Sequence, residues 1–260
     1  MNNINNFLFI EERQNEILNY INDNEKSSTE EIIDVFKISK STVRRDLIEL
    51  EKRNMIIRAR GGALKKKFFR YEFTLDEKKD LNLKKKLKIA NIARRYVENG
   101  DVIYISGGTT TYEFTKLLFD INDLVVFTNA FNILSELTNN PNINIKFLGG
   151  DFRRKTFSCV GQDTTSVMQK YNFNKAFIGA NGVSIDVGIT TPNELEAKVD
   201  GEVIKRSKES FLLVDDTKFG AVAFSVIADL SDIDYIVTNE EPESDIKETM
   251  NRKKVEIIYK

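Results

Sequence analysis

The sequence contains no histidine and a single cysteine, Cys159, among its 260 residues. One cysteine excludes an internal disulfide framework. Because zinc sites draw mainly on cysteine and histidine, a zinc finger or a zinc-hydroxide enzyme is strongly disfavoured, and we predict no metal site. The missing histidine also removes the commonest general base and every Ser-His-Asp or Cys-His arrangement. We therefore predict no catalytic residue and no cofactor.

Long apolar stretches are missing as well. No run reaches the roughly 18 apolar residues that span a bilayer, so we expect no membrane partner. The N-terminal segment "MNNINNFLFIEERQNEIL" has no basic part, no long apolar part and no small-residue cleavage site, unlike a secretory signal. The apolar content of 41% and the charged content of 30% are ordinary for a globular protein. We expect a cytoplasmic protein.

Basic residues are concentrated in one part of the chain, although the net charge is only −1. Residues 37–95 carry 20 basic and 7 acidic side chains, whereas residues 1–36 carry 2 and 8, and residues 96–260 carry 17 and 25. A basic block between acidic flanks favours a polyanionic partner.

Local patterns predict three helices near the N-terminus. Apolar residues at helical spacing indicate the first helix over Phe9–Asn22. In "SSTEEIIDVF", Ser28 stands three residues before Glu31, and this capping-box pattern marks the start of the second helix. After a short break, Ser39 can cap a third helix, whose inward face is formed by Val43, Leu47 and Leu50.

A glycine pair follows the third predicted helix. The segment "MIIRARGGALKKKF" reads as two short strands around Gly61-Gly62, which is a hairpin turn signal. Three helices and a two-stranded wing make a winged helix-turn-helix. We predict this domain over residues 1–67 and a linker over residues 68–80.

The rest of the chain, residues 81–260, alternates short β-rich runs with helical ones. A helix is predicted over Lys84–Val97. Near-continuous apolar strands with connections long enough for crossover helices favour an α/β fold with a mostly parallel sheet covered on both faces. The predicted strands are residues 102–105, 124–127, 144–148, 175–179, 211–214, 234–238 and 255–259.

The exposed side of the third predicted helix carries polar and basic residues near its N-terminal end. Recognition helices present that end to base edges in the major groove, where arginine makes bidentate contacts to guanine. The alternative is an ordinary solvated face, and the lysine runs at 65–67 and 84–86 could add only general electrostatics. The predicted DNA-binding residues are Ser39, Lys40, Ser41, Thr42, Arg44, Arg45, Arg58, Arg60, Gly61 and Gly62.

Three segments, "ERQNEILNYI", "SKSTVRRDLIELEKRNMI" and "RARGGAL", resemble the DNA-binding domain of the DeoR family of bacterial transcriptional regulators. The resemblance covers about residues 11–64. It implies that Thr42, Arg44 and Arg45 contact DNA and that Asp46 orients a neighbouring arginine. Arg60 stands where the family usually has histidine.

The segment "DVIYISGGTTTYEFTKLL" has the order strand, small-residue loop, helix. Gly107 and Gly108 permit a tight turn, and the amides of Thr109, Thr110 and Thr111 would point outward at a helix N-terminus. Such an end suits an anion such as phosphate. The segment matches neither a P-loop nor the dinucleotide-binding fingerprint. A purely structural strand-to-helix turn is the alternative.

Other small or polar clusters also follow predicted strands, and ligands in open α/β sheets bind at those carboxyl ends. Lys218 could supply a positive charge for a phosphate. Ordinary turn chemistry is the alternative for each cluster. The clusters are Thr128-Asn129, Gly149-Gly150, Gly179-Ala180-Asn181-Gly182 and Asp215-Asp216-Thr217-Lys218.

The C-terminal part also resembles the DeoR family, in "GGTTTYEF", "VVFTN", "FLGGDFR", "KAFIGANGVSIDVGITT" and "LLVDDTKFG". These motifs are similar to those of its sensor domain, whose fold is similar to ribose-5-phosphate isomerase. The resemblance implies a phosphorylated sugar or related metabolite as ligand, although Asp200 stands where the family often has lysine. It implies an effector site made of Gly107, Gly108, Thr109, Thr110, Thr111, Thr128, Asn129, Gly149, Gly150, Gly179, Glu196 and Lys218.

Together these features predict a DNA-binding transcriptional regulator and not an enzyme. We expect a repressor of sugar or carbohydrate metabolism genes that binds double-stranded operator DNA as a homo-oligomer and is relieved by a small phosphorylated metabolite. The alternative is a phosphosugar isomerase or hydrolase with an accessory nucleic-acid-binding domain. Its carboxylate base would be Glu194, Glu196, Asp215 or Asp216. RNA binding is less favoured because no exposed aromatic platform is evident.

Overall fold

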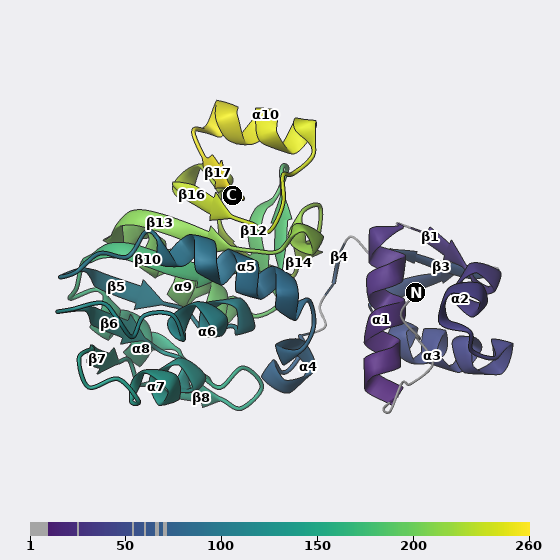
Figure 1. Ribbon diagram of the computed structural model, residues 1–260, viewed down its shortest axis with the longest axis horizontal. Coiled ribbons are helices and arrows are strands. Elements are labelled where there is room, and N and C mark those ends of the chain that lie inside the picture. The colour runs from purple at the N-terminus through teal and green to yellow at the C-terminus, as the bar shows by residue number, and fades with distance from the viewer. Residues whose placement is uncertain (1–9, 25, 54, 60, 66–67, 70–71) are drawn as a thin grey trace. The chain divides into compact units, whose positions relative to one another are not determined.

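The computed structural model describes residues 10–24, 26–53, 55–59, 61–65, 68–69 and 72–260. The chain divides into an N-terminal unit, Met1–Tyr71, and a C-terminal unit, Glu72–Lys260. Each unit has its own set of helices and strands (Figure 1). None of the helices within these ranges is both long enough and apolar enough to cross a lipid bilayer.

The N-terminal unit has the elements of a winged helix-turn-helix. Its strands form a three-stranded sheet in the order β1-β3-β2, in which both pairings are antiparallel. Strand β4 (Phe68–Phe69) follows the wing. The three helices are α1 (Ile10–Asp23), α2 (Thr29–Phe36) and α3 (Lys40–Lys52), and the sheet strands are β1 (Lys26–Ser28), β2 (Ile56–Ala59) and β3 (Gly62–Lys65).

Local capping explains where α2 and α3 begin. Ser28 and Glu31 form the predicted capping box, in which each side chain accepts a hydrogen bond from the other residue's backbone amide. Ser39 caps α3, because its hydroxyl accepts a hydrogen bond from the Thr42 amide at 3.2 Å. Both predicted helix starts are therefore confirmed.

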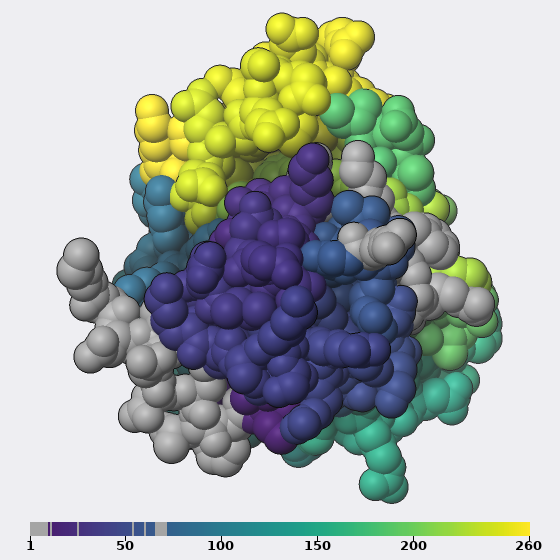
Figure 2. All heavy atoms as spheres, turned by 90° about the vertical axis from the view of Figure 1, so that its right-hand side faces the viewer, coloured from purple at the N-terminus to yellow at the C-terminus, as the bar shows by residue number. Residues whose placement is uncertain are grey.

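The core of the N-terminal unit is formed where its three helices meet. Figure 2 shows the atoms of this unit, in purple to blue, packed as one continuous body. The inward face predicted for α3 is confirmed, since Val43, Leu47 and Leu50 are all buried. They meet buried residues of the other two helices, among them Ile17, Ile21 and Ile32.

The C-terminal unit is built on a seven-stranded sheet. All seven predicted strands belong to this sheet, and every neighbouring pair within it is parallel. The strand order is β17-β16-β13-β10-β5-β6-β7. The strands are β5 (Val102–Ile105), β6 (Val125–Thr128), β7 (Asn144–Phe147), β10 (Phe173–Gly179), β13 (Ser207–Leu213), β16 (Tyr235–Val237) and β17 (Glu256–Ile258).

Helices cover both faces of this sheet, which explains why its strands are near-continuously apolar. Alternate residues of one strand reach opposite sides: Tyr104 belongs to one apolar cluster, and Ile103 and Ile105 belong to the other. One face is covered by α5 (Leu83–Arg94), α6 (Thr109–Thr115) and α7 (Phe131–Leu137). The other is covered by α8 (Gln162–Met168), α9 (Glu194–Arg206) and α10 (Ser244–Lys253).

Smaller elements surround the sheet. Strands β8 (Asp151–Arg153) and β9 (Ser158–Val160) form an antiparallel pair. Strands β11 (Gly182–Ser184), β12 (Gly188–Thr191) and β15 (Ser225–Ala228) form an antiparallel sheet. The remaining elements are α4 (Leu75–Lys79), β14 (Val222–Ala223) and the short 3-10 helices η1 (Asp216–Lys218) and η2 (Leu230–Asp232).

The structure differs from the predicted linker, residues 68–80, in its second half. Residues 72–80 belong to the C-terminal unit, and they include the helix α4. Arg153 holds Glu72 in a bidentate ion pair, with nitrogen–oxygen distances of 2.9 and 2.7 Å. The Thr74 hydroxyl and Glu77 form a capping box at the start of α4. These contacts order a segment that has no apolar periodicity.

Candidate functional site

The first turn of α3 presents three hydroxyl groups beside each other. The Ser39 hydroxyl lies 2.9 Å from that of Ser41 and 2.8 Å from that of Thr42. Because Ser39 also caps the helix, its extended backbone fixes the point at which the chain turns into α3. Three of the predicted DNA-binding residues are thus gathered at one helix end.

Arg44 and Arg45 project from α3 on the side away from the core. Both are exposed, and neither forms an ion pair with any residue that the structure describes. Lys40, also exposed, lies 3.5 Å from a carboxylate oxygen of Glu30, an ion pair that solvent weakens. The two arginines are therefore available to a ligand outside the protein.

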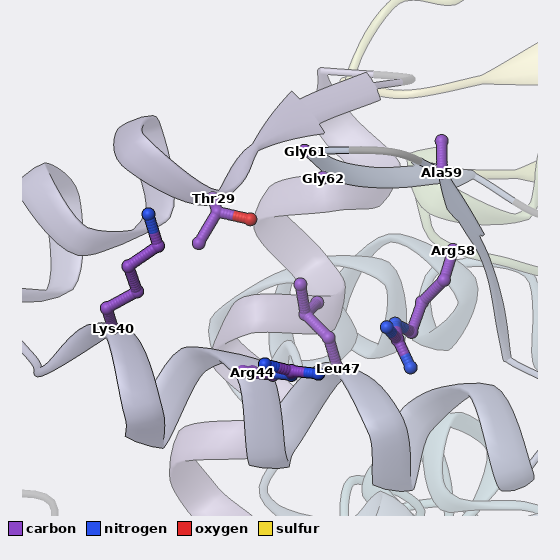
Figure 3. A pocket seen from close by; sticks show the side chains of 8 residues that line it. All are labelled: Thr29, Lys40, Arg44, Leu47, Arg58, Ala59, Gly61 and Gly62. Carbon is purple, nitrogen blue, oxygen red and sulfur yellow. The ribbon is translucent and has the colours of Figure 1, made fainter.

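The wing and α3 face a shared hollow (Figure 3). Arg58 extends from the wing toward α3 and lies 3.1 Å from Glu51. The Thr29 amide donates to the carbonyl oxygen of Gly61 at 2.8 Å, which ties the start of α2 to the wing turn. The hollow is lined by Thr29, Lys40, Arg44, Leu47, Arg58, Ala59, Gly61 and Gly62.

The two glycines of the wing turn have different physical roles. Gly61 has a φ of +91°, which favours glycine, and a Cβ there would meet no atom within 4 Å. Gly62 packs against β1, because a Cβ there would lie 2.2 Å from the carbonyl oxygen of Ser27. Arg60, the remaining predicted DNA-binding residue, lies outside the described residues.

Asp46 lies on the buried side of α3 and pairs with α1. Its carboxylate accepts from Arg13 Nε at 2.6 Å, from a terminal nitrogen of Arg13 at 3.0 Å and from Gln14 Nε2 at 3.1 Å. The arginine that Asp46 orients is therefore Arg13, 33 residues earlier in the chain. This contact ties α3 to α1 on the buried side of the helix that carries the exposed arginines.

In the C-terminal unit, the Gly/Thr loop joins β5 to α6 at the carboxyl edge of the sheet. The Ser106 amide donates to the Phe177 carbonyl at 3.0 Å, and the Ser106 hydroxyl accepts from the Gly179 amide at 3.1 Å. A Cβ at Gly107 would lie 3.2 Å from Ala130 Cβ and 3.6 Å from Ser158 Cβ. The loop is therefore beside the ends of two neighbouring strands and the β8–β9 pair.

The threonines of this loop are not equivalent. Thr109 and Thr110 are half-buried at the start of α6, whereas Thr111 is fully buried. The Thr111 hydroxyl has no hydrogen-bond partner within the described part of the chain. Thr109 and Thr110 are thus the loop residues whose side chains a ligand could reach.

Glu196 connects α9 to the β8–β9 pair. Its carboxylate accepts from the Ser158 hydroxyl at 3.1 Å and from the Thr156 hydroxyl, and it pairs with Arg153 at 2.5 Å. Its amide is capped by the Asn193 side chain at 3.1 Å. A carboxylate with these partners is held in place as an acceptor, which disfavours it as a free general base.

Three lysines come together near this loop from three different elements. Lys218 lies on η1, Lys86 on α5 and Lys78 on α4, and the charge of Lys218 lowers the pKa of both Lys78 and Lys86. Burial is the main cause that lowers the pKa of Lys86 to about 8, and the charges of Lys218 and Lys78 contribute to the same shift. The site is therefore positive at one end.

The other predicted effector residues differ in their surroundings. Thr128 and Asn129 are buried: the Thr128 hydroxyl accepts from the Ala130 amide, and Asn129 bonds to the Tyr104 hydroxyl and the Cys159 carbonyl. Gly149 and Gly150 pack against Thr164 of α8. Gly179 ends β10 with open space on its Cβ side. Contacts through Ser106 and Ser158 thus bring the Gly/Thr loop together with Gly179 and Glu196.

Three further carboxyl groups bear on the enzyme alternative. Burial raises the pKa of Asp200, one helical turn beyond Glu196 on α9, well above its ordinary value, and Glu196 raises it further. Burial also raises the pKa of Asp215, but Lys218 and the hydrogen bonds from Thr217 outweigh it and leave that pKa below its ordinary value. Asp216 pairs with Lys85 at 2.8 Å. Asp215 and Asp216 are thus both engaged, by hydrogen bonds from Thr217 and by the ion pair with Lys85.

Comparison with known families covers both units. The family model of the DeoR C terminal sensor domain matches residues 81–240, and that of the DeoR-like helix-turn-helix domain matches residues 13–67. The chain belongs to the DeoR family. The predicted family and its winged helix-turn-helix and α/β sensor architecture are thereby confirmed.

Relatives in the DeoR family match nearly the whole chain. The uncharacterized HTH-type transcriptional regulator FruR of Bacillus subtilis is 36% identical over 88% of this chain and 91% of its own. The HTH-type transcriptional repressor GlcR of the same organism is 30% identical over 96% of each. A solved D-ribose-5-phosphate isomerase is 21% identical over 52% of each chain, with a TM-score of 0.39. This DeoR-family protein is a DNA-binding transcriptional regulator and not an enzyme.

Several charged residues of this DeoR-family regulator were not singled out as site residues from the sequence. Arg153, Glu72, Lys78 and Lys86 lie in or beside the sensor site, and Arg13 supports α3. A lysine within "KKK" gives no local sign of burial. Arg13 and Arg153 did stand in quoted motifs, "ERQNEILNYI" and "FLGGDFR", but neither was named as a site residue.

The buried Lys86 predicts a pH dependence of stability. Between its folded pKa of about 8 and the ordinary value of 10.5, the unfolded chain binds a proton that the folded chain has released. The free energy of unfolding therefore rises with pH over this range, by up to about 1.4 kcal/mol per pH unit. Urea unfolding from pH 7 to 10 should show this rise, and Lys86→Met should show a clearly smaller one.

Lys88→Met is the matched control, because it removes an exposed lysine from the same helix. The control should keep the wild-type slope. Equal slopes in Lys86→Met and Lys88→Met would contradict the assignment.

Proposed function

We propose that this regulator is a cytoplasmic repressor of sugar or carbohydrate metabolism genes, and that a phosphorylated metabolite in the C-terminal unit relieves repression. The observation that carries the DNA-binding part is the pair of exposed arginines at the N-terminal end of α3, which pair with no acidic residue among those that the structure describes and lie beside a hollow shared with the wing. Repression, as opposed to activation, is supported by the relative GlcR, which is named a transcriptional repressor.

The metabolite is proposed from the chemistry of the sensor site. The Gly107–Thr110 loop leads into the N-terminus of α6, and α6 packs against α4 and α5, which carry Lys78 and Lys86. Backbone amides and lysine ammonium groups both stabilise phosphate oxygens. Glu196 and its hydroxyl neighbours, in contrast, are acceptors and donors suited to sugar hydroxyl groups.

We further propose that the regulator binds its operator as a homo-oligomer. Winged and other helix-turn-helix proteins commonly bind two half-sites as dimers, so that the operator repeats the symmetry of the protein. Ligand binding would then change operator affinity only if the ligand prefers one of two arrangements of the oligomer.

A direct test combines DNA binding with ligand addition. Fluorescence anisotropy with the fragment upstream of the protein's own gene should show binding that a scrambled fragment of equal length does not. A panel of hexose and pentose phosphates should release the fragment, whereas the same unphosphorylated sugars should not. Absence of sequence-dependent binding would reject the DNA-binding part, and release by unphosphorylated sugars alone would reject the phosphate part.

Thr110→Glu is expected to remove the ligand response while DNA binding stays intact. A carboxylate at the start of α6 opposes the positive helix end and repels a phosphate, so the ligand concentration needed for DNA release should rise about 10-fold or more. Anisotropy titration of bound operator measures this.

Ser135→Glu places the same charge at an exposed position of α7 and serves as the control. It should respond like the wild type. A wild-type response in Thr110→Glu would mean that the loop is a structural turn.

A further inference from the structure

Arg153 pairs with two carboxylates that belong to different parts of the C-terminal unit. Its terminal nitrogens Nη1 and Nη2 donate to the two carboxylate oxygens of Glu72 at 2.9 and 2.7 Å. Nη1 also lies 2.5 Å from Oε1 of Glu196, the predicted effector residue on α9. All three side chains are at most 17% exposed. One nitrogen atom therefore links the start of the C-terminal unit to the sensor site.

The carboxylate of Glu196 is engaged through only one of its oxygens. Oε1 accepts from the Ser158 hydroxyl at 3.1 Å, from the Thr156 hydroxyl and from Arg153. Oε2 has no partner in the part of the chain that the structure describes. A carboxylate oxygen accepts hydrogen bonds, and a sugar hydroxyl group donates them. Oε2 is thus the atom of this network that is open to a ligand hydroxyl.

The β8–β9 pair places the network beside the Gly/Thr loop. Arg153 and Ser158 are register partners, so their side chains lie on the same face of the pair. Phe152 lies on the opposite face and is 50% exposed. A Cβ at Gly107 would lie 3.6 Å from Ser158 Cβ. The face that carries Arg153 and Ser158 is therefore the one that meets Glu196 and the loop.

Glu72 stands at the point where the C-terminal unit begins. The chain before it, Met1–Tyr71, forms the N-terminal unit that contains α3. Two residues after Glu72, Thr74 caps α4, and the Leu75 amide donates to the Lys155 carbonyl at 3.3 Å. Lys155 lies in the turn between β8 and β9. The β8–β9 pair thus holds the start of α4 through a side chain and through its backbone.

We propose that Arg153 is a positioning residue that couples effector binding at Glu196 to the segment leading to the DNA-binding unit. This inference rests on the proposed sugar phosphate effector and assigns a role to its hydroxyl groups. A hydroxyl group that donates to Oε2 partly satisfies the negative charge of Glu196 and weakens its pairing with Nη1. The guanidinium group then pairs more fully with Glu72. The effector therefore prefers one of two arrangements, as a ligand must if it is to shift an equilibrium.

The test compares effector binding with DNA release in the full-length protein, with ribose 5-phosphate and glucose 6-phosphate as probes from the sugar phosphate panel. The rise in melting temperature measures binding, and anisotropy of the bound operator fragment measures release. Glu72→Gln keeps the shape of the side chain and removes its charge. The probe concentration that releases half of the operator should rise about 10-fold or more, whereas the concentration for a given rise in melting temperature should change less than about 3-fold.

A second variant removes the bridge from the other side. Arg153→Lys keeps the positive charge but replaces a fork of donors by one ammonium group, which cannot pair with two carboxylates in the same way. It should separate the two concentrations as Glu72→Gln does. The matched controls are Arg154→Lys, at the exposed neighbouring arginine, and Asp76→Asn, at a carboxylate of α4 whose side chain is 89% exposed. Both controls should follow the wild type.

Three outcomes would contradict this inference. Operator release by Glu72→Gln or Arg153→Lys at the wild-type concentration would overturn the coupling and leave the proposed effector class standing. Equal losses of binding and release in both variants would show that Arg153 only supports the structure of the site, which also overturns the coupling. If the whole panel of sugar phosphates leaves the wild type unaffected, the effector class is rejected, and the role of Arg153 with it.

Discussion

Arg44→Ala is expected to weaken binding to the specific operator by about 10- to 100-fold, which corresponds to 1–3 kcal/mol. Arg44 is exposed, lines the hollow between α3 and the wing, and has no ion-pair partner among the described residues. Its guanidinium group can therefore form two hydrogen bonds to the major-groove edge of a guanine. Anisotropy titrations with operator and with scrambled DNA measure the change.

The control for this variant is Lys52→Ala. Lys52 is a cation at the other end of α3, with a side chain that is 70% exposed. Its removal should change affinity for both DNA sequences equally and only slightly. If Arg44→Ala lowers both affinities equally and makes the salt dependence shallower, Arg44 contacts the phosphate backbone and reads no base.

Asp46→Ala is expected to lower the free energy of unfolding of the N-terminal unit by about 3 kcal/mol, because breaking a buried pair leaves the other charge without a partner. Asp46 is 1% exposed, and its carboxylate accepts hydrogen bonds from both Arg13 and Gln14. The Arg13 side chain is 17% exposed, so some water reaches its guanidinium group. The expected loss therefore lies at the lower end of the about 3–5 kcal/mol that breaking a buried ion pair costs. Hydrogen exchange of the α1 and α3 amides in the full-length protein measures the loss of protection.

Two further variants sharpen this test. Asp34→Ala removes an exposed carboxylate from α2 and should leave the protection unchanged. Arg13→Met combined with Asp46→Leu replaces the ion pair by an apolar pair and should recover part of the loss. Protection in Asp46→Ala equal to that in Asp34→Ala would show that the buried pair does not hold α3.

The elements that could be predicted from the sequence are those with strong local patterns. The capping residues Ser28 and Ser39 mark helix starts because a hydroxyl there bonds to an amide only two or three residues away. The seven strands of the main sheet are apolar runs because both of their faces are covered. The antiparallel β8–β9 pair and the β11-β12-β15 sheet were not predicted, since their short, mixed segments carry no such pattern.

The candidate site residues also divide into those that the sequence could predict and those that it could not. The outward direction of Arg44 and Arg45 follows from the helical spacing of Val43, Leu47 and Leu50. In the sensor site, the Gly/Thr loop and Lys218 could be named from their motifs. The burial of Thr128 and Asn129 could not, because both follow a strand just as a ligand-binding residue would.

The sequence by itself determined the two domains, the helix that carries the paired arginines and the strands of the parallel sheet, because periodicity and capping act over a few residues. Only the tertiary structure decided the strand order β17-β16-β13-β10-β5-β6-β7 and the pairing of Arg13 with Asp46 and of Arg153 with Glu72 and Glu196. Those contacts join residues far apart in the chain, so they depend on how the connections cross the sheet and which charges burial brings together.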